Sequence, residues 1–281
     1  MAVVVLAATG FATGSALARL AYDHGADPLS VNSTRVLVAA CVLGIFLRSA
    51  GVPIRLPPRD ALAAAAIGAV MGAYAWSLFK AIELIPVPVA VLIFYTYPLM
   101  VAAVTWASGD ERPTWRSAGA VLLGFAGVGL ALDPAGRSVG AGGVLHALLA
   151  ALGFTTVVSI NGRLFRGRDS RPITLHMLGA ATVFYGIVFV TLYDYAAPRD
   201  AAGWSFLFAS CAAYTIAVIS LFTAVSAIGP LRTSLFMNWE PIASIILAAL
   251  LLGQHLLPIQ FGGAALVLTA LFLVRARRAR A

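Results

Sequence analysis

Charge is what this 281-residue sequence lacks most: only 11% of its residues are charged, whereas 61% are hydrophobic. Soluble domains carry roughly 25% charged and 45–50% apolar residues. So few charges could not cover the surface of a 29.2 kDa globule. The composition therefore excludes a soluble enzyme, a disordered chain and a secreted disulfide scaffold, and it predicts an integral membrane protein.

Reactive and metal-binding groups are also scarce. Cys41 and Cys211 both lie within apolar stretches, and we interpret them as small packing residues. The histidines are scattered with no pair four residues apart, so no metal site is predicted. The sequence has no phosphate-binding glycine loop for ATP hydrolysis, no Ser/His/Asp set and no paired intramembrane aspartates. We therefore predict no enzyme activity and no cofactor.

The chain reads as a series of apolar runs separated by clusters of proline, glycine, aspartate and arginine. A transmembrane helix needs roughly 20 apolar residues, so these runs predict an all-α polytopic protein with ten transmembrane helices. The predicted spans are residues 2–22, 29–48, 60–82, 87–108, 115–132, 139–162, 172–193, 201–226, 230–252 and 258–275. The first run lacks a basic leader and is long enough to span, so we expect a retained helix rather than a cleaved signal peptide.

Basic residues dominate the few charges, and the formal net charge is +8. No nucleic-acid partner is expected, because the basic residues are not interleaved with aromatic residues on a polar face. Most arginines fall on one side of the predicted topology, in loops after the even-numbered spans and at the C-terminus. They are Arg48, Arg55, Arg59, Arg112, Arg116, Arg163, Arg166, Arg168, Arg171, Arg232, Arg275, Arg277, Arg278 and Arg280, against Arg137 and Arg199 on the other side. The positive-inside rule then predicts that both termini lie in the cytoplasm. The membrane expected under the transporter hypothesis given below is the inner (plasma) membrane of a bacterial-type cell.

Three basic residues, Arg19, Arg35 and Lys80, fall near span ends on the opposite side. We expect their long side chains to snorkel to the membrane surface. Lys80 also precedes Glu83 by three residues, which predicts a local ion pair on one helix face.

One constant offset relates the two halves of the chain. Ser77-Leu78-Phe79 recurs as Ser220-Leu221-Phe222, and 220 − 77 = 143; the same offset pairs Ile85 with Ile228, Pro98 with Pro241 and Gly119 with Gly262. We predict two five-helix repeats, residues 1–136 and 137–281, and the odd number of spans makes the second repeat inverted. Inverted repeats are a recurrent transporter architecture, with the substrate site near the membrane midplane.

Several motifs recur around these positions. The first repeat carries a short proline hairpin, Tyr97-Pro98 within a span, Gly109-Asp110-Glu111-Arg112-Pro113-Thr114 and Gly119, and the second carries Glu240-Pro241, Gly253-Gln254 and Gln260-Phe261-Gly262. These motifs resemble the EamA module of the drug/metabolite transporter superfamily over essentially the whole chain. The resemblance implies ten helices, inverted topology and export of small metabolites such as amino acids. Gln254 departs from it, because the family usually has an acidic residue there.

Glu240 is the only acidic residue deep in a predicted span. A carboxylate at that depth is costly and usually faces a cavity or a partner, so Glu240 is a candidate to bind a substrate amine or to carry a coupling proton. A carboxyl group that only stabilises the kink at Pro241 is the alternative. The offset maps Tyr97 onto Glu240 and Tyr95 onto Asn238, which adds these residues to the predicted site; packed aromatics with a bonded hydroxyl explain the tyrosines equally well.

The remaining candidates are weaker. Pro98 and Pro241 each free a backbone carbonyl one turn earlier, so we predict either substrate contacts or hinges at these positions. Aromatic and hydrogen-bonding residues complete the predicted substrate site, although interhelical packing explains each of them as well. They are Tyr74, Ser77, Phe79, Trp239, Thr13 and Asn161.

The leading hypothesis is a secondary transporter that exports amino acids or similar small metabolites by alternating access. Its partners would be a small amino acid-like substrate and the lipid bilayer, and its glycine-rich faces fit either close helix packing or a homodimer. The alternatives are a lipid flippase or scramblase, an exporter of nucleosides, sugars or cationic drugs, and an embedded scaffold without transport.

Overall fold

The computed structural model describes residues 2–85, 87–109, 114–132, 140–252 and 258–275. All regular structure in these ranges is helical. The helices are α1 (Ala2–Asp23), α2 (Pro28–Ser49), α3 (Pro58–Leu84), α4 (Val87–Phe94), α5 (Tyr97–Ala107), α6 (Trp115–Leu132), α7 (Ala141–Leu164), α8 (Ser170–Thr191), α9 (Ala201–Ile228), α10 (Pro230–Met237), α11 (Trp239–Leu252) and α12 (Pro258–Arg275).

Each predicted span coincides with one helix or with two consecutive helices, so the all-α prediction is confirmed. Seven helices in the described ranges, with α4 and α5 counted as one, are long and apolar enough to cross a membrane. The exact number of crossings and the side on which the termini lie stay predictions. The repeat boundary predicted at residues 136/137 and the Gln254 position lie outside the described residues.

Aspartate caps fix the starts of three helices. Asp27 accepts hydrogen bonds from two backbone N–H groups in the first turn of α2, and Pro28 occupies the first helical position. Asp169 caps α8 and Asp200 caps α9 in the same way, the latter by accepting from the Gly203 N–H at 2.8 Å. A carboxylate at an N-cap satisfies N–H groups that have no partner within the helix, so these residues end the loops sharply.

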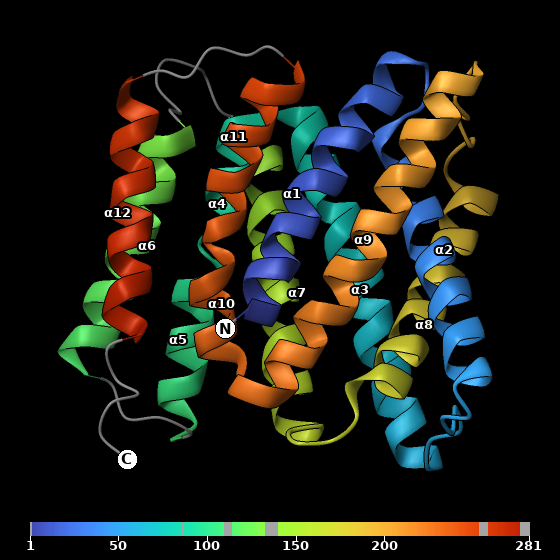
Figure 1. Ribbon diagram of the computed structural model, residues 1–281, viewed down its shortest axis with the longest axis horizontal. Coiled ribbons are helices and arrows are strands. Elements are labelled where there is room, and N and C mark those ends of the chain that lie inside the picture. Colours follow the sequence, from blue (N-terminus) through green and yellow to red (C-terminus); the bar gives the residue numbers. More distant parts are fainter. Residues whose placement is uncertain (1, 86, 110–113, 133–139, 253–257, 276–281) are drawn as a thin grey trace.

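The helices lie side by side in an arrangement that repeats itself (Figure 1). α6 packs against α12 at one edge of the bundle, and α2 packs against α8 near the other. Between these pairs, α1 runs along α9 and α7 runs along α3. Exchanging the first five spans for the last five converts the α1–α9 pairing into the α7–α3 pairing and leaves the α6–α12 and α2–α8 pairings unchanged. The packing is therefore that of two related halves.

Individual contacts obey the 143-residue offset. Gly10 lies against Ala217, where an added Cβ would be 3.0 Å from the Ala217 Cβ, and Gly153 lies against Tyr74, where it would be 2.5 Å from the Tyr74 Cβ. Adding 143 to 10 and to 74 gives 153 and 217, so the two contacts are equivalent. The missing side chain of each glycine lets α1 approach α9, and α7 approach α3, closely.

The fourth and ninth spans are broken at equivalent places. α4 ends at Phe94 and α5 begins at Tyr97, and α10 ends at Met237 shortly before Pro241. Because proline lacks an N–H and clashes with the preceding turn, each break lies just before a proline. The predicted spans 87–108 and 230–252 therefore each consist of two consecutive helices, and Val89–Ala107 together is long and apolar enough to cross a membrane. The breaks also meet, since the Tyr97 hydroxyl donates to the Ser234 carbonyl at 3.5 Å.

Small residues also set the spacing of other helix pairs. Gly68 of α3 lies directly on the backbone of Met177 in α8, where an added Cβ would be 2.6 Å from the Met177 Cα. Cys211 is buried in a small apolar cluster, as predicted, whereas Cys41 is exposed. Cys41 therefore does not pack in the interior of the bundle.

Candidate functional site

Aromatic side chains from three spans gather around the break between α4 and α5. The Tyr97 ring lies 4.6 Å from the Phe154 ring of α7, and the Tyr74 ring of α3 lies 5.3 Å from Phe154, measured between centroids. Tyr95 lies 5.7 Å from Tyr97. Tyr95 and Tyr97 are almost fully buried. We call Tyr74, Phe94, Tyr95, Tyr97 and Phe154 the aromatic cluster.

Glu240 adjoins this cluster from the other repeat. It is the second residue of α11 and is half-buried. Tyr95, Tyr74 and Tyr97 all lie within electrostatic range of the Glu240 carboxyl group. The structure thus brings together Glu240, Tyr74, Tyr95 and Tyr97, four of the residues that we predict to bind substrate.

Arg35 lies in the interior, contrary to the snorkelling expected from the sequence. Only 8% of it is exposed, and its Nη2 donates to the Asn32 Oδ1 at 3.0 Å. Its guanidinium carbon lies 5.1 Å from the centroid of the Tyr214 ring, a cation–π contact. The reason is the direction in which α2 turns Arg35, onto α9 and α8, so that the side chain cannot reach the surface.

The other two basic residues near span ends behave differently. Arg19 is exposed and pairs with Asp23 at 3.4 Å. Lys80 pairs with Glu83 at 2.7 Å, which confirms the predicted ion pair, and its Nζ lies 4.7 Å from the Tyr193 ring centroid.

A chain of buried polar groups supports Arg35. The Asn32 Nδ2 donates to the Tyr185 hydroxyl at 2.7 Å, so the other side of the amide faces Arg35. Asn32 and Tyr185 are 5% and 2% exposed. Sequence reasoning missed these residues. The available signal was the spacing of Asn32 and Arg35, three residues apart within an apolar run and hence on one helix face.

Other predicted site residues bond to neighbouring helices. The Ser77 hydroxyl lies 3.1 Å from the His146 Nδ1, and the Asn161 Nδ2 donates to the Met177 Sδ at 3.3 Å. Along α7, at 1.5 Å per residue, His146 lies about 12 Å from Phe154 in one direction and Asn161 about 10 Å in the other. The structure therefore does not bring Asn161 to the aromatic cluster, whereas Ser77 lies one turn from Tyr74 on α3 with its hydroxyl near His146.

The last predicted residues flank the second break. The Trp239 Nε1 donates to the Thr9 hydroxyl of α1 at 3.1 Å. Asn238 is buried against α6, where its amide packs on Gly124. Thr13 of α1 and Phe79 of α3 are half-buried. Pro98 and Pro241 are buried beside the breaks, and their role as hinges stays a prediction.

Polar contacts between the two repeats lie at both ends of the bundle. At one end, the His24 Nδ1 lies 2.8 Å from the Asp200 carboxylate. At the other end, Arg168 pairs with Asp60 of α3 at 2.7 Å. Glu240 and the aromatic cluster lie between these two layers.

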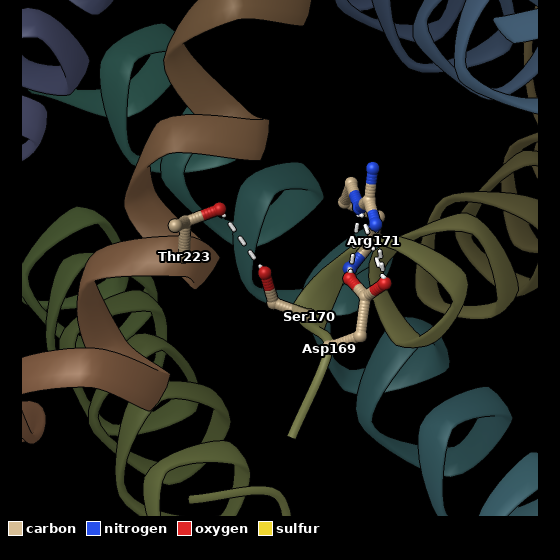
Figure 2. A network of polar contacts seen from close by, with 4 residues as sticks. All are labelled: Asp169, Ser170, Arg171 and Thr223. Atoms are coloured by element: carbon tan, nitrogen blue, oxygen red, sulfur yellow. Dashed lines mark hydrogen bonds and ion pairs between the residues drawn. The ribbon is translucent and has the colours of Figure 1, made fainter. Parts of the chain in front are cut away.

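Figure 2 shows how the loop that carries Arg168 is held. Asp169 forms a two-pronged ion pair with Arg171, and the Ser170 hydroxyl lies 3.0 Å from the Thr223 hydroxyl of α9. The hydrogen bond from the Arg171 side chain holds the pKa of Asp169 below its ordinary value, which favours the charged form of the capping carboxylate. This loop is therefore fixed to α9 of its own repeat and to α3 of the other.

An open groove of about 670 Å³ lies between α3 and α8. Its lining is mostly apolar and includes Ala65 and Ala69 from α3 and Gly179 and Val183 from α8. None of its lining residues belongs to the aromatic cluster, and Glu240 is not among them. Since Val183 is largely exposed, the groove faces outward from the bundle.

Comparison with known proteins agrees with this architecture. The sequence profile of the EamA-like transporter family matches residues 1–132 and 141–276, which confirms the resemblance seen in the motifs. One solved structure, described only as the crystal structure of a protein, superposes with a TM-score of 0.83. It is 18% identical in sequence, and the alignment covers 99% of this chain and 98% of that one, so the likeness concerns the fold alone. No curated protein matches the chain.

Proposed function

Because the chain belongs to the EamA-like transporter family, a family of membrane transporters of small molecules rather than enzymes, we propose that it is a secondary transporter that exports amino acids or similar small metabolites. The single observation that carries the proposal is the position of Glu240. It lies at a helix break deep in the bundle, next to tyrosines contributed by the opposite repeat. Such a carboxylate suits an ammonium group or a coupling proton.

The transport mechanism that we propose is alternating access. The first four spans (α1–α5) and spans six to nine (α7–α11) would rock against each other around Glu240, with Pro98 and Pro241 as hinges. Helices α6 and α12 pack mainly on each other, which supports a peripheral role for them. The polar contacts at the two ends of the bundle would then break alternately.

Purified protein in liposomes tests the proposal. We expect counterflow of at least one labelled amino acid, faster when a pH gradient is imposed. Glu240→Gln should abolish the response to the gradient, because the amide cannot carry a proton. Glu83→Gln is the matched control, since Glu83 is exposed and pairs with Lys80.

Two results would contradict the proposal. The absence of flux for every amino acid and amine would refute the substrate class. Unchanged flux and an unchanged gradient response in Glu240→Gln would show that Glu240 is structural only, as expected if this carboxyl group merely stabilises the kink at Pro241.

A lipid flippase is the second candidate, favoured by the apolar groove between α3 and α8, which opens outward where lipid chains would lie. Liposomes that contain a fluorescent lipid separate the two candidates. An amino acid exporter leaves lipid translocation at the rate of protein-free liposomes, whereas a flippase or scramblase accelerates it.

A further inference from the structure

Arg35 is a buried cation with no acidic partner in the described part of the chain. None of the ion pairs among the described residues includes Arg35. Arginine has five N–H donors and stays charged. Only a hydrogen bond to Asn32 is present, and the Nε is buried without a partner. An unpaired charge within a membrane span is costly, so it marks a functional position.

The surroundings of Arg35 hold the guanidinium group in a fixed orientation. Asn32 is itself held by Tyr185 of α8, and it accepts a hydrogen bond from Arg35 on its other side. The Tyr214 ring of α9 packs against the guanidinium group. The planar fork of arginine is thus positioned by three helices before any ligand arrives, and such a fork matches the two oxygens of a carboxylate.

The groups that face Arg35 leave its charge uncompensated. Besides Asn32, the residues that interact with it electrostatically include Tyr22, Tyr185, Tyr214 and Cys211. Phenols and thiols are neutral at physiological pH. None of these groups is an anion, so the guanidinium group has no negative charge in direct contact.

The carboxylate of Glu240 provides the opposite pole. None of the ion pairs among the described residues joins it to Arg35. Tyr214, whose ring lies against Arg35, and Tyr95, which adjoins Glu240, belong to one buried core cluster. Arg35 comes from the first repeat and Glu240 from the second. A positive and a negative pole that flank one buried cluster without pairing match a zwitterion, whose ammonium and carboxylate groups are both attached to a single carbon atom.

We propose that Arg35 binds the α-carboxylate of a free amino acid whose ammonium group is bound by Glu240. The inference rests on the proposed function and narrows it. Free amino acids satisfy both poles, whereas cationic drugs and amines leave Arg35 unpaired, and nucleosides and sugars leave both poles unpaired. A ligand that lacks either charge leaves one buried charge of the protein unpaired, which is costly. The two poles therefore discriminate against such ligands.

The test is competition against counterflow in liposomes, with the amino acid of highest flux as the labelled substrate. The competitors are the same unlabelled amino acid, its methyl ester and the corresponding decarboxylated amine. In the wild-type protein, the ester and the amine should inhibit about 10- to 100-fold more weakly than the free amino acid, the range expected for hydrogen bonds to a charged group.

Variants separate binding by Arg35 from a structural role. Arg35→Gln should weaken inhibition by the free amino acid by the same factor. Inhibition by the ester should stay within about twofold of that in the wild-type protein. Arg35→Lys should fall between, because lysine keeps the charge but not the two-pronged geometry. Arg19→Gln is the matched control, since Arg19 is exposed and pairs with Asp23.

The outcomes distinguish this inference from the proposed function. No flux of any amino acid overturns both. Two outcomes overturn the role of Arg35 but not the proposed transport of amino acids. One is flux that the ester inhibits as strongly as the free amino acid does, and the other is an Arg35→Gln variant with unchanged affinity for the free amino acid. If Arg35→Gln does not fold, the comparison of competitors in the wild-type protein decides alone.

Discussion

The hydrogen bond between Asn32 and Tyr185 allows a direct test of what burial is worth in this protein. Two tyrosine hydroxyls bond to side chains of α2 at the same distance, 2.7 Å: Tyr185 to Asn32 and Tyr195 to Thr34. The first pair is buried, whereas Tyr195 is 46% exposed. The two pairs therefore differ mainly in access to water.

Removing the hydroxyl has unequal expected costs. In Tyr185→Phe the Asn32 amide loses its partner in the interior, and an unsatisfied buried donor costs about 1–3 kcal/mol. In Tyr195→Phe water replaces the hydroxyl, and surface substitutions usually change stability by no more than about 0.5 kcal/mol. At about 2–4 °C per kcal/mol, Tyr185→Phe should lower the Tm by roughly 2–12 °C and Tyr195→Phe by about 2 °C or less.

Thermal unfolding of the purified protein in one detergent, followed by intrinsic fluorescence, measures both variants under the same conditions. Tyr195→Phe serves as the control, because it removes the same hydroxyl from a pair that water reaches. Equal Tm values for the two single variants would refute the reasoning. They would show that Asn32 finds another partner or that water reaches it.

Two further predictions concern packing and pH. Gly68→Ala should lower the Tm, because the new Cβ meets the Met177 backbone and overpacking costs about 1–3 kcal/mol. Gly186→Ala is the control and should raise the Tm slightly, because nothing lies within 4 Å of the added Cβ. Equal Tm values for the two variants would contradict the close contact of α3 with α8. The pKa of Asp200 is held below its ordinary value of 3.8 by hydrogen bonds from the Gly203 N–H and then His24, so its charged form stabilises the fold above pH 3.8 and loses that effect as the pH falls through the lower folded-state pKa. The Tm difference between the wild type and Asp200→Asn should therefore be larger at neutral pH than well below pH 3.8, and a difference independent of pH would contradict it.

The helix pattern was predictable because a membrane span needs a long apolar run, which a sequence displays directly. Helix breaks were less predictable. Pro98 and Pro241 indicated a freed carbonyl, but a proline kink and a complete interruption have the same sequence signature. The structure decides for interruption, because α4 ends at Phe94 before α5 begins at Tyr97, and α10 ends at Met237 before α11 begins at Trp239.

The candidate site divides in the same way. Glu240 was found because a lone acidic residue deep in a span is rare. Arg35 was assigned to the membrane surface because its distance from the end of its span allows snorkelling, and a linear sequence does not show which neighbour blocks the side chain. Asn161 could not be separated from Tyr74 either, since both are polar residues within spans.

The sequence by itself determined that the chain enters a membrane and that its halves are related by a 143-residue offset, because both properties depend on residue types at positions along one dimension. Only the tertiary structure decided that Arg35 is buried and that it faces the same interior as Glu240. The burial of Arg35 depends on how α2 is rotated about its own axis. That rotation results from side-chain packing between α2, α8 and α9, which no single segment encodes.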